Sequence, residues 1–156
     1  MKMLALYYFR VKLAIGLALG LGSISTAGDW PIFRGPDLNG ISKEAGLSSE
    51  GKAEIIWNAE LGLGYSAPVI ADGRVIISGH DGKETDTLFC LDEATGEVKW
   101  RHSYPQPLAD LYFQGGTTGT ATIDSDHVFH VARQGELVCL EAATGKIVWK
   151  KHLQDD

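Results

Sequence analysis

Residues 90–100 of the chain read CLDEATGEVKW, and residues 139–149 read CLEAATGKIVW, almost the same sequence 49 residues further on. The Ala-Thr-Gly in each stretch is typical of a tight turn in which glycine adopts a positive φ, and the apolar runs beside it indicate strands. Repeats of about 40 to 50 residues built from short strands are typical of β-propellers, whose four-stranded blades need neighbours to bury their faces. The repeat therefore predicts an all-β propeller with four-stranded antiparallel blades.

Each copy of the repeat contains four runs with the composition of strands, separated by turn residues such as Asp72-Gly73 and Asp124-Ser125-Asp126. We therefore expect about two complete blades. The expected strands are 65–71, 74–79, 87–92 and 97–103 in the first blade, and 118–123, 127–132, 136–141 and 146–152 in the second.

A partial third copy lies upstream of the two complete ones. Residues 54–61 read EIIWNAEL and place Trp57 where Trp100 and Trp149 stand in the complete copies, but the three strands that should come first are not there. Circular propellers often close by lending a strand from one end of the chain to the blade at the other end, which removes the open edges. We expect residues 54–62 to be an orphan outer strand of this kind.

The repeat resembles that of the PQQ-like (quinoprotein-type, pyrroloquinoline quinone) β-propeller family, whose motif runs Ala-x-Asp-x-x-Thr-Gly-x-x-x-Trp. The first copy has Cys90 in place of Ala, and it matches the motif at Asp92, Thr95, Gly96 and Trp100. The second copy has Cys139 in place of Ala and Glu141 in place of Asp, and it matches at Thr144, Gly145 and Trp149. Residues 29–36, DWPIFRGP, also resemble the start of secreted bacterial PQQ-binding-like repeat proteins.

The resemblance implies that the motif tryptophans dock against the neighbouring blade. Trp57, Trp100 and Trp149 are accordingly interpreted as packing residues rather than redox or ligand sites. Cys90 and Cys139 occupy equivalent positions in successive blades, and the rotation between blades separates them well beyond the ~7 Å Cα distance that a disulfide allows. The prediction is two free, buried thiols.

The first 27 residues have the pattern of a secretory signal peptide: basic residues, an apolar run at 13–24, and Ser25-Thr26-Ala27 before a cut at Gly28. The apolar run is too short to span a bilayer, which takes roughly 20 residues, so we expect an exported protein, periplasmic or extracellular, without a membrane span in its mature form. The full chain carries 14 basic and 20 acidic residues. Removing the leader leaves a net charge of −9, which argues against nucleic acid as a partner.

The remaining chain is expected to comprise a strap at 28–53, the orphan strand at 54–62, one blade at 63–104, another at 105–152, and a truncated end at 153–156. Closed propellers use about 4 to 8 blades, so two blades make an incomplete ring. The expectation is the N-terminal portion of a longer propeller, whose further blades belong to the same chain. The alternative is a short chain that completes its ring as a homo-oligomer.

Long, varied loops are expected at one end of the blades, called here the loop-rich rim, and short, uniform turns at the other. Ligand sites in propellers belong on such a rim or in the axial channel. The candidate residues on the loop-rich rim are Tyr65, Ser66, His80, Asp81, Tyr112, Gln114, Thr117, Arg133 and Gln134.

Metal binding and catalysis find little support in the sequence. His127 and His130 point to opposite faces of a strand, so they are not a ligand pair, and residues 81–86 lack the alternating oxygen ligands of a calcium loop. We assign no catalytic residue, metal ligand or cofactor to this segment.

The first functional hypothesis is a binding or scaffold module of the cell envelope or exterior, with an envelope protein or a carbohydrate as its partner. The alternative, implied by the resemblance, is a PQQ-dependent dehydrogenase of alcohols or sugars, with PQQ and calcium at the propeller axis and catalytic residues beyond this segment. The vicinal cysteine pair on which such enzymes stack the quinone is absent from the sequence. A carbohydrate-active or other enzymatic propeller is a third hypothesis.

Overall fold

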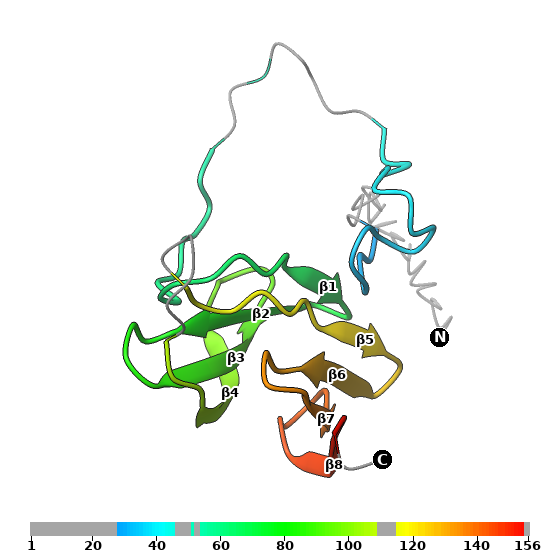
Figure 1. Ribbon diagram of the computed structural model, residues 1–156. Helices are drawn as coiled ribbons and strands as arrows, with labels where there is room; N and C mark the ends of the chain where they lie inside the picture. Colours follow the sequence, from blue (N-terminus) through cyan, green and yellow to red (C-terminus); the bar gives the residue numbers. More distant parts are fainter. Residues whose placement is uncertain (1–27, 46–50, 52–53, 109–114, 155–156) are drawn as a thin grey trace, which may run out of the picture.

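The computed structural model describes residues 28–45, 51, 54–108 and 115–154. Within them the chain forms two four-stranded antiparallel sheets, in the order β1-β2-β3-β4 and β5-β6-β7-β8 (Figure 1). The first sheet, blade 1, consists of β1 (Val69–Ala71), β2 (Arg74–His80), β3 (Thr85–Asp92) and β4 (Val98–Pro105). The second sheet, blade 2, consists of β5 (Thr122–Asp124), β6 (His127–Val131), β7 (Glu136–Glu141) and β8 (Ile147–His152). The predicted all-β fold with four-stranded antiparallel blades is confirmed.

The innermost strand of each blade is shorter than the sequence predicts. The run expected at 65–71 pairs with β2 only from Val69, and the run expected at 118–123 pairs with β6 only from Thr122. The residues before these strands bond to each other instead: the backbone N–H of Tyr65 donates to the Thr117 carbonyl (2.7 Å), and that of Ala67 donates to the Thr120 hydroxyl (3.0 Å). The error arises because these contacts join segments about 50 residues apart, which local composition does not reveal.

The Thr-Gly turn between the third and fourth strands has the same construction in both blades. In blade 1, Asp92 Oδ1 accepts the N–H groups of Ala94 and Thr95 (3.0 Å each), and Gly96 has a φ of 73°. In blade 2, the Thr144 hydroxyl donates to the Glu141 carboxylate (2.7 Å), and Gly145 has a φ of 70°. The longer Glu side chain therefore caps the turn where the first copy has Asp.

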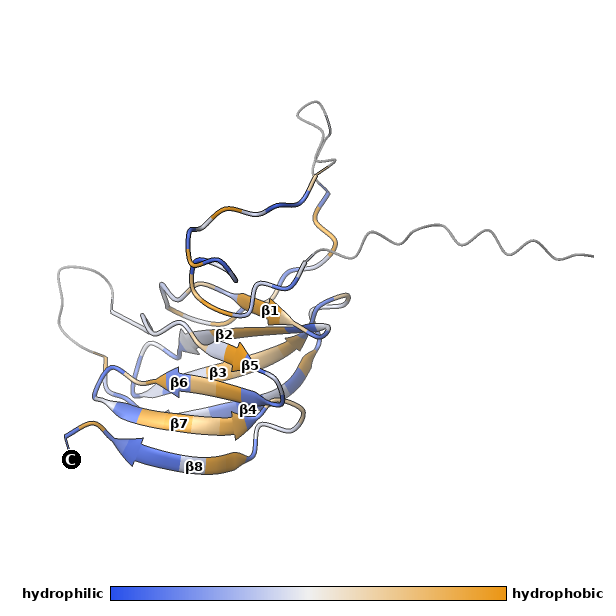
Figure 2. Cartoon of the chain, turned by 90° about the vertical axis from the view of Figure 1, so that its right-hand side faces the viewer, coloured by the Kyte–Doolittle hydropathy of each residue, from blue (hydrophilic) through white to orange (hydrophobic). Residues whose placement is uncertain are grey.

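One apolar core joins the two blades. It includes Val69, Ile76 and Leu88 of blade 1 and Val128 and Leu140 of blade 2, all fully buried. The sheets approach each other most closely where β1 meets β5 (Figure 2), which makes these the axial strands of a propeller. Cys90 and Cys139 are buried in this structure and free, as predicted.

The strap that precedes the blades crosses both axial strands. Trp30 exchanges two backbone hydrogen bonds with Ile70 of β1 (2.7 and 3.0 Å), and the Pro31 carbonyl accepts the N–H of Ile123 in β5 (2.8 Å). The Trp30 ring lies against Gly35, so close that a Cβ built on that glycine would be 2.6 Å from the ring. The strap thus covers the edges of β1 and β5 that face away from their own sheets.

Candidate functional site

The contact between the blades is made by a tryptophan of one blade and a Thr-Gly turn of the next. Trp100 lies in β4, and its indole N–H donates to the Ala142 carbonyl of blade 2 (2.9 Å). Its ring lies so close to Gly145 that an added Cβ would meet it at 2.7 Å. Only glycine therefore allows the ring to approach this turn.

Trp57 makes the same contact with blade 1. Its indole N–H donates to the Glu93 carbonyl (2.8 Å), and its ring would meet a Cβ on Gly96 at 2.6 Å. Residues 54–62 form no strand with the described part of the chain. Trp57 nevertheless contacts blade 1 in the same way as Trp100 contacts blade 2. The role of this segment as a ring-closing strand remains a prediction.

Two of the rim candidates, His80 and Asp81, organise the loop between β2 and β3. The buried His80 ring accepts the Gly82 N–H at Nδ1 (2.8 Å), so Nε2 carries the proton and donates to the Gln106 carbonyl (2.8 Å). Asp81 Oδ1 accepts the N–H groups of Lys83, Glu84 and Thr85, and these bonds, that to Lys83 foremost, lower the pKa of the Asp81 carboxyl. Both side chains are committed to holding the loop.

The other rim candidates are distributed along the same end of the blades. Ser66 is hydrogen-bonded to Ser78 (2.9 Å between hydroxyls), Thr117 is buried, and Tyr65 and Gln134 are exposed. The Arg133 guanidinium donates to the Pro107 carbonyl (3.4 Å). Tyr112 and Gln114 lie outside the described residues.

A buried polar cluster beside these candidates was not identified from the sequence. The Tyr104 hydroxyl of blade 1 lies 2.8 Å from His130 Nε2 of blade 2 and 3.5 Å from Asp86 Oδ2. Arg133 Nε approaches the same Asp86 oxygen at 3.7 Å, and His80 Nε2 lies 4.0 Å from Asp86 Oδ1. These contacts make the cluster a polar bridge between the blades.

Burial controls the ionisation of this cluster. Desolvation raises the pKa of the Asp86 carboxyl, although Arg133 and His80 act in the opposite direction. Desolvation also lowers the pKa of His130 to about 4, with a smaller contribution from His102, so this imidazole is neutral at pH 7. The hydrogen bond between the Tyr104 hydroxyl and Nε2 of the neutral His130 ring stabilises the contact between blades.

The sequence contains one signal that could have identified the cluster. Inward-facing positions of a strand are usually apolar. Three such positions, on β3, β4 and β6, carry the polar residues Asp86, Tyr104 and His130. What strand periodicity does not reveal is that three such positions, on three different strands, meet at one point.

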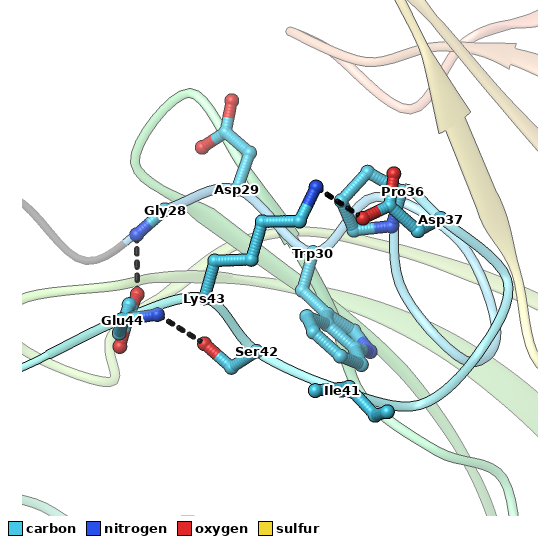
Figure 3. Close-up of a pocket in the computed structure, with 9 residues that line it drawn as sticks. All are labelled: Gly28, Asp29, Trp30, Pro36, Asp37, Ile41, Ser42, Lys43 and Glu44. Atoms are coloured by element: carbon cyan, nitrogen blue, oxygen red, sulfur yellow. Dashed lines mark hydrogen bonds and ion pairs between the residues drawn. The ribbon is translucent and has the colours of Figure 1, made fainter.

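Of three hollows at the surface of the described residues, two lie away from this cluster. One of about 530 Å³ is formed within the strap, where Trp30 and Ile41 lie below the Asp37–Lys43 ion pair (2.6 Å) and Pro36 lies beside it, as Figure 3 shows. Another, of about 480 Å³, lies beside Trp149 on blade 2. A third, of about 130 Å³, lies on the loop-rich rim between Tyr104, Gln106 and Glu136.

The described residues contain no group of three or more His, Cys, Asp or Glu side chains placed to hold a metal ion. They also contain no helix with the length and apolar character needed to cross a membrane.

The blades and their tryptophan contacts define a β-propeller repeat protein. The chain belongs to the PQQ-like repeat family: the family profile described as outer membrane protein assembly factor BamB matches residues 48–115 and, in a second register, residues 84–156. The two overlapping matches reflect the internal repeat.

Known proteins similar to the chain are of two kinds. The quinoprotein ethanol dehydrogenase of Pseudomonas aeruginosa is 32% identical over 95 residues, which are 58% of this chain and 14% of that protein. The crystal structure of BamB from Moraxella catarrhalis matches with a TM-score of 0.39 and 21% identity, over 60% of this chain and 23% of that one. A europium-containing methanol dehydrogenase matches with a TM-score of 0.46 and 17% identity, over 64% and 18% of the two chains. The chain thus spans less than a quarter of the length of each.

Proposed function

We propose that the chain is part of an exported propeller, periplasmic or extracellular, that acts as a binding or scaffold module. The proposal rests on the observation that the polar residues at the loop-rich rim make structural contacts. His80, Asp86, Tyr104 and His130 are buried and bonded to one another or to neighbouring backbone. These groups therefore hold the loop after β2 and the contact between the blades. The surface that a partner can reach is then the varied loops above them.

The position of the strap supports the same proposal. Trp30 and Pro31 bond to the free edges of β1 and β5. These are the edges that would line the channel of a closed ring. A ligand in that channel would meet the strap before it met these strands. The chain is thereby suited to present its rim to a partner rather than to enclose a substrate beside these two blades.

The described residues do not fit a site for PQQ and calcium. The two cysteines lie on different strands in different blades, and both thiols are buried, so neither offers a surface on which a quinone could stack. No cluster of carboxylates or histidines in this part of the chain is placed to coordinate a divalent cation.

The alternative remains a PQQ-dependent dehydrogenase of alcohols or sugars, whose catalytic residues lie outside this segment. The observation that favours it is the 32% identity to the quinoprotein ethanol dehydrogenase. The chain matches 14% of that enzyme, so the likeness reaches only a small part of it.

One experiment separates the two functions. The protein purified from its source is incubated with saturating PQQ and calcium, and reduction of an artificial electron acceptor is followed with ethanol or glucose as substrate. The scaffold proposal expects a flat trace, and substrate-dependent reduction would establish the dehydrogenase instead.

A second experiment tests the binding role directly. Residues 109–114, which the sequence predicts to belong to a loop of the loop-rich rim, are replaced by a Gly-Ser linker of equal length, which leaves the buried Tyr104 and Thr117 in place. Pull-down from envelope extract should recover a defined partner with the wild type and lose it with this variant. The matched control is Lys146→Ala, an exposed residue in the turn at the opposite end of blade 2. Equal recovery with all three proteins would contradict binding by this rim loop.

A further inference from the structure

The hollow of about 130 Å³ on the loop-rich rim, called here the rim hollow, is built by both blades. Residues 104–106, at the end of β4, line it from blade 1. Ala132, Gln134, Glu136 and His152 line it from blade 2. The rim hollow therefore lies across the contact between the blades and opens among the loops of the rim.

Gln106 brings a buried polar group to the rim hollow. The residue is 3% exposed, and its backbone is held from two sides, because its N–H donates to the Glu84 carbonyl (2.7 Å) and its carbonyl accepts His80 Nε2–H (2.8 Å). Its side-chain carboxamide forms no hydrogen bond with any residue that the structure describes. A carboxamide taken out of water costs free energy unless its donor and its acceptor find partners. We expect an occupant of the rim hollow to supply those partners.

The opposite wall is fixed before any ligand arrives. In the turn from β6 to β7, the Ala132 N–H donates to the Glu136 carbonyl (2.8 Å), and the Gly135 N–H donates to the Ala132 carbonyl (2.9 Å). The Gly135 carbonyl in turn accepts the N–H of Leu153 (2.9 Å). The exposed Gln134 thus lies on a turn that is tied down on both sides, and a site with rigid walls loses little entropy when it binds.

The charge of the lining groups favours a neutral ligand. The Glu136 carboxylate pairs with the Lys150 ammonium group (3.2 Å), which offsets its charge. The carboxamides of Gln106 and Gln134 are neutral, and each can donate and accept hydrogen bonds. Hydroxyl groups match such partners, because a hydroxyl also donates and accepts, whereas a phosphate or an ammonium ion needs an unpaired opposite charge.

The size and the walls of the rim hollow narrow the ligand further. At about 30 Å³ for each water molecule, 130 Å³ holds about four hydroxyl-sized groups, which is one edge of a sugar ring. Tyr104, Pro105 and Ala132 add apolar surface, which suits the C–H face of such a ring. We propose that the rim hollow binds one sugar residue of a carbohydrate by its hydroxyl edge, and that Gln106 is its main hydrogen-bonding group.

This inference rests on the proposed binding role of the rim and names a carbohydrate as its ligand. It does not involve residues 109–114, so the two proposals can fail separately. Loss of a protein partner with the linker variant, together with no sugar binding, would leave the scaffold role standing and remove the sugar site. Sugar binding without a protein partner would do the reverse.

The test is saturation-transfer-difference NMR on the full chain with D-glucose, D-galactose, D-mannose and N-acetyl-D-glucosamine as separate probes. Single sugars bind a small site with a Kd on the order of 1 mM, which this method detects. We expect at least one of the four to receive saturation, first at the ring protons that lie against Tyr104. No transfer to any of them from a chain that far-UV circular dichroism shows to be folded would overturn the inference. Transfer to N-methylacetamide but to no sugar would do so as well, because the hollow would then take a peptide group.

Gln106→Leu separates a ligand-binding carboxamide from a structural one. Leucine is similar in size, and the carboxamide has no partner in the described protein, so the thermal unfolding midpoint should stay the same or rise. The Kd for the sugar should rise by about tenfold or more, since the main hydrogen-bonding group is gone. Asn58→Leu, which replaces an exposed carboxamide in the segment before blade 1, is the matched control and should leave the Kd unchanged. Sugar binding retained by Gln106→Leu, or a lower midpoint in that variant, would assign the carboxamide to the fold and overturn the inference.

Discussion

Gly145 and Gly73 have the same backbone conformation, with a φ of 70° in each, but different surroundings. A Cβ on Gly145 would strike the Trp100 ring at 2.7 Å, whereas a Cβ on Gly73 would meet nothing within 4 Å. At both positions, the left-handed φ costs free energy only when glycine is replaced by a residue with a Cβ. Comparing the two therefore separates backbone strain from the loss of the blade contact.

We expect Gly73→Ala to lower the free energy of unfolding by about 1 kcal/mol, the cost of a left-handed alanine. Gly145→Ala should lower it by about 3 kcal/mol or more, because Trp100 must also move out of its contact. Urea denaturation followed by far-UV circular dichroism measures both. Equal effects would show that Trp100 does not depend on this glycine.

His130 predicts an acid-sensitive contact between blades. Its pKa falls from 6.5 to about 4 on folding, so the native state takes up this proton less readily than the unfolded chain. The stability that neutral His130 contributes is present above pH 6.5 and is lost as the pH falls toward 4, by about 3 kcal/mol in all.

The groups that face His130 are Tyr104, with Asp86 and Arg133 behind it, and His102. Asp86 acts in the opposite direction, because its raised pKa adds stability as the pH falls. Thermal unfolding from pH 7 to 4 should be measured for wild type and His130→Gln, since the variant removes only the histidine contribution. Parallel curves for the two proteins would refute the assignment.

The thiols give a simpler prediction at the same scale. Burial raises the pKa of Cys90 to about 11 and also raises the pKa of Cys139, and both side chains are out of reach of solvent. Neither should react with Ellman's reagent at pH 7 in the native protein, and both should react in guanidinium chloride. A Cys90–Cys139 linkage in a non-reducing peptide map would contradict the structure.

At the scale of elements, the strap is the part whose attachment depends on few contacts. A Cβ on Gly35 would lie 2.6 Å from the Trp30 ring, while Gly40 has the same φ of 76° and open space around it. Gly35→Ala should displace Trp30 and lower hydrogen-exchange protection at the amides of Ile70 and Ile123, each of which bonds to the strap. Gly40→Ala should leave both amides protected. Unchanged protection in Gly35→Ala would show that Trp30 is not what holds the strap.

The strands themselves show where local sequence suffices. The strand from Glu136 to Glu141 begins and ends as predicted, because Gly135 and the Ala-Thr-Gly turn bound it on both sides. The axial strands β1 and β5 have only three residues each, since the residues before them bond to one another across the two blades. Contacts with residues distant in sequence therefore determine where β1 and β5 begin.

At the scale of the whole molecule, the two blades are coupled through Trp100. Trp100→Ala removes a ring that is 8% exposed and its hydrogen bond to Ala142, so it should lower the free energy of unfolding by about 3 to 5 kcal/mol. Trp149→Ala removes a ring that is 39% exposed and should cost this chain about 1 kcal/mol or less. Equilibrium denaturation of both variants is the measurement. Similar losses would mean that the blade contact contributes little to stability.

The sequence by itself determined the blade fold, its two Thr-Gly turns, the packing role of Trp57 and Trp100, and the free state of the cysteines. The fold and its turns follow from spacing and turn chemistry, which act over a few residues and recur in each copy of the repeat, and the packing role of the tryptophans follows from the resemblance to the PQQ-like repeat. Only the tertiary structure decided that Asp86, Tyr104, His130 and Arg133 meet, and that the strap bonds to both axial strands. The physical reason is that such contacts depend on the angle between two sheets and on the path of a distant segment, and neither is encoded in the periodicity of any one strand.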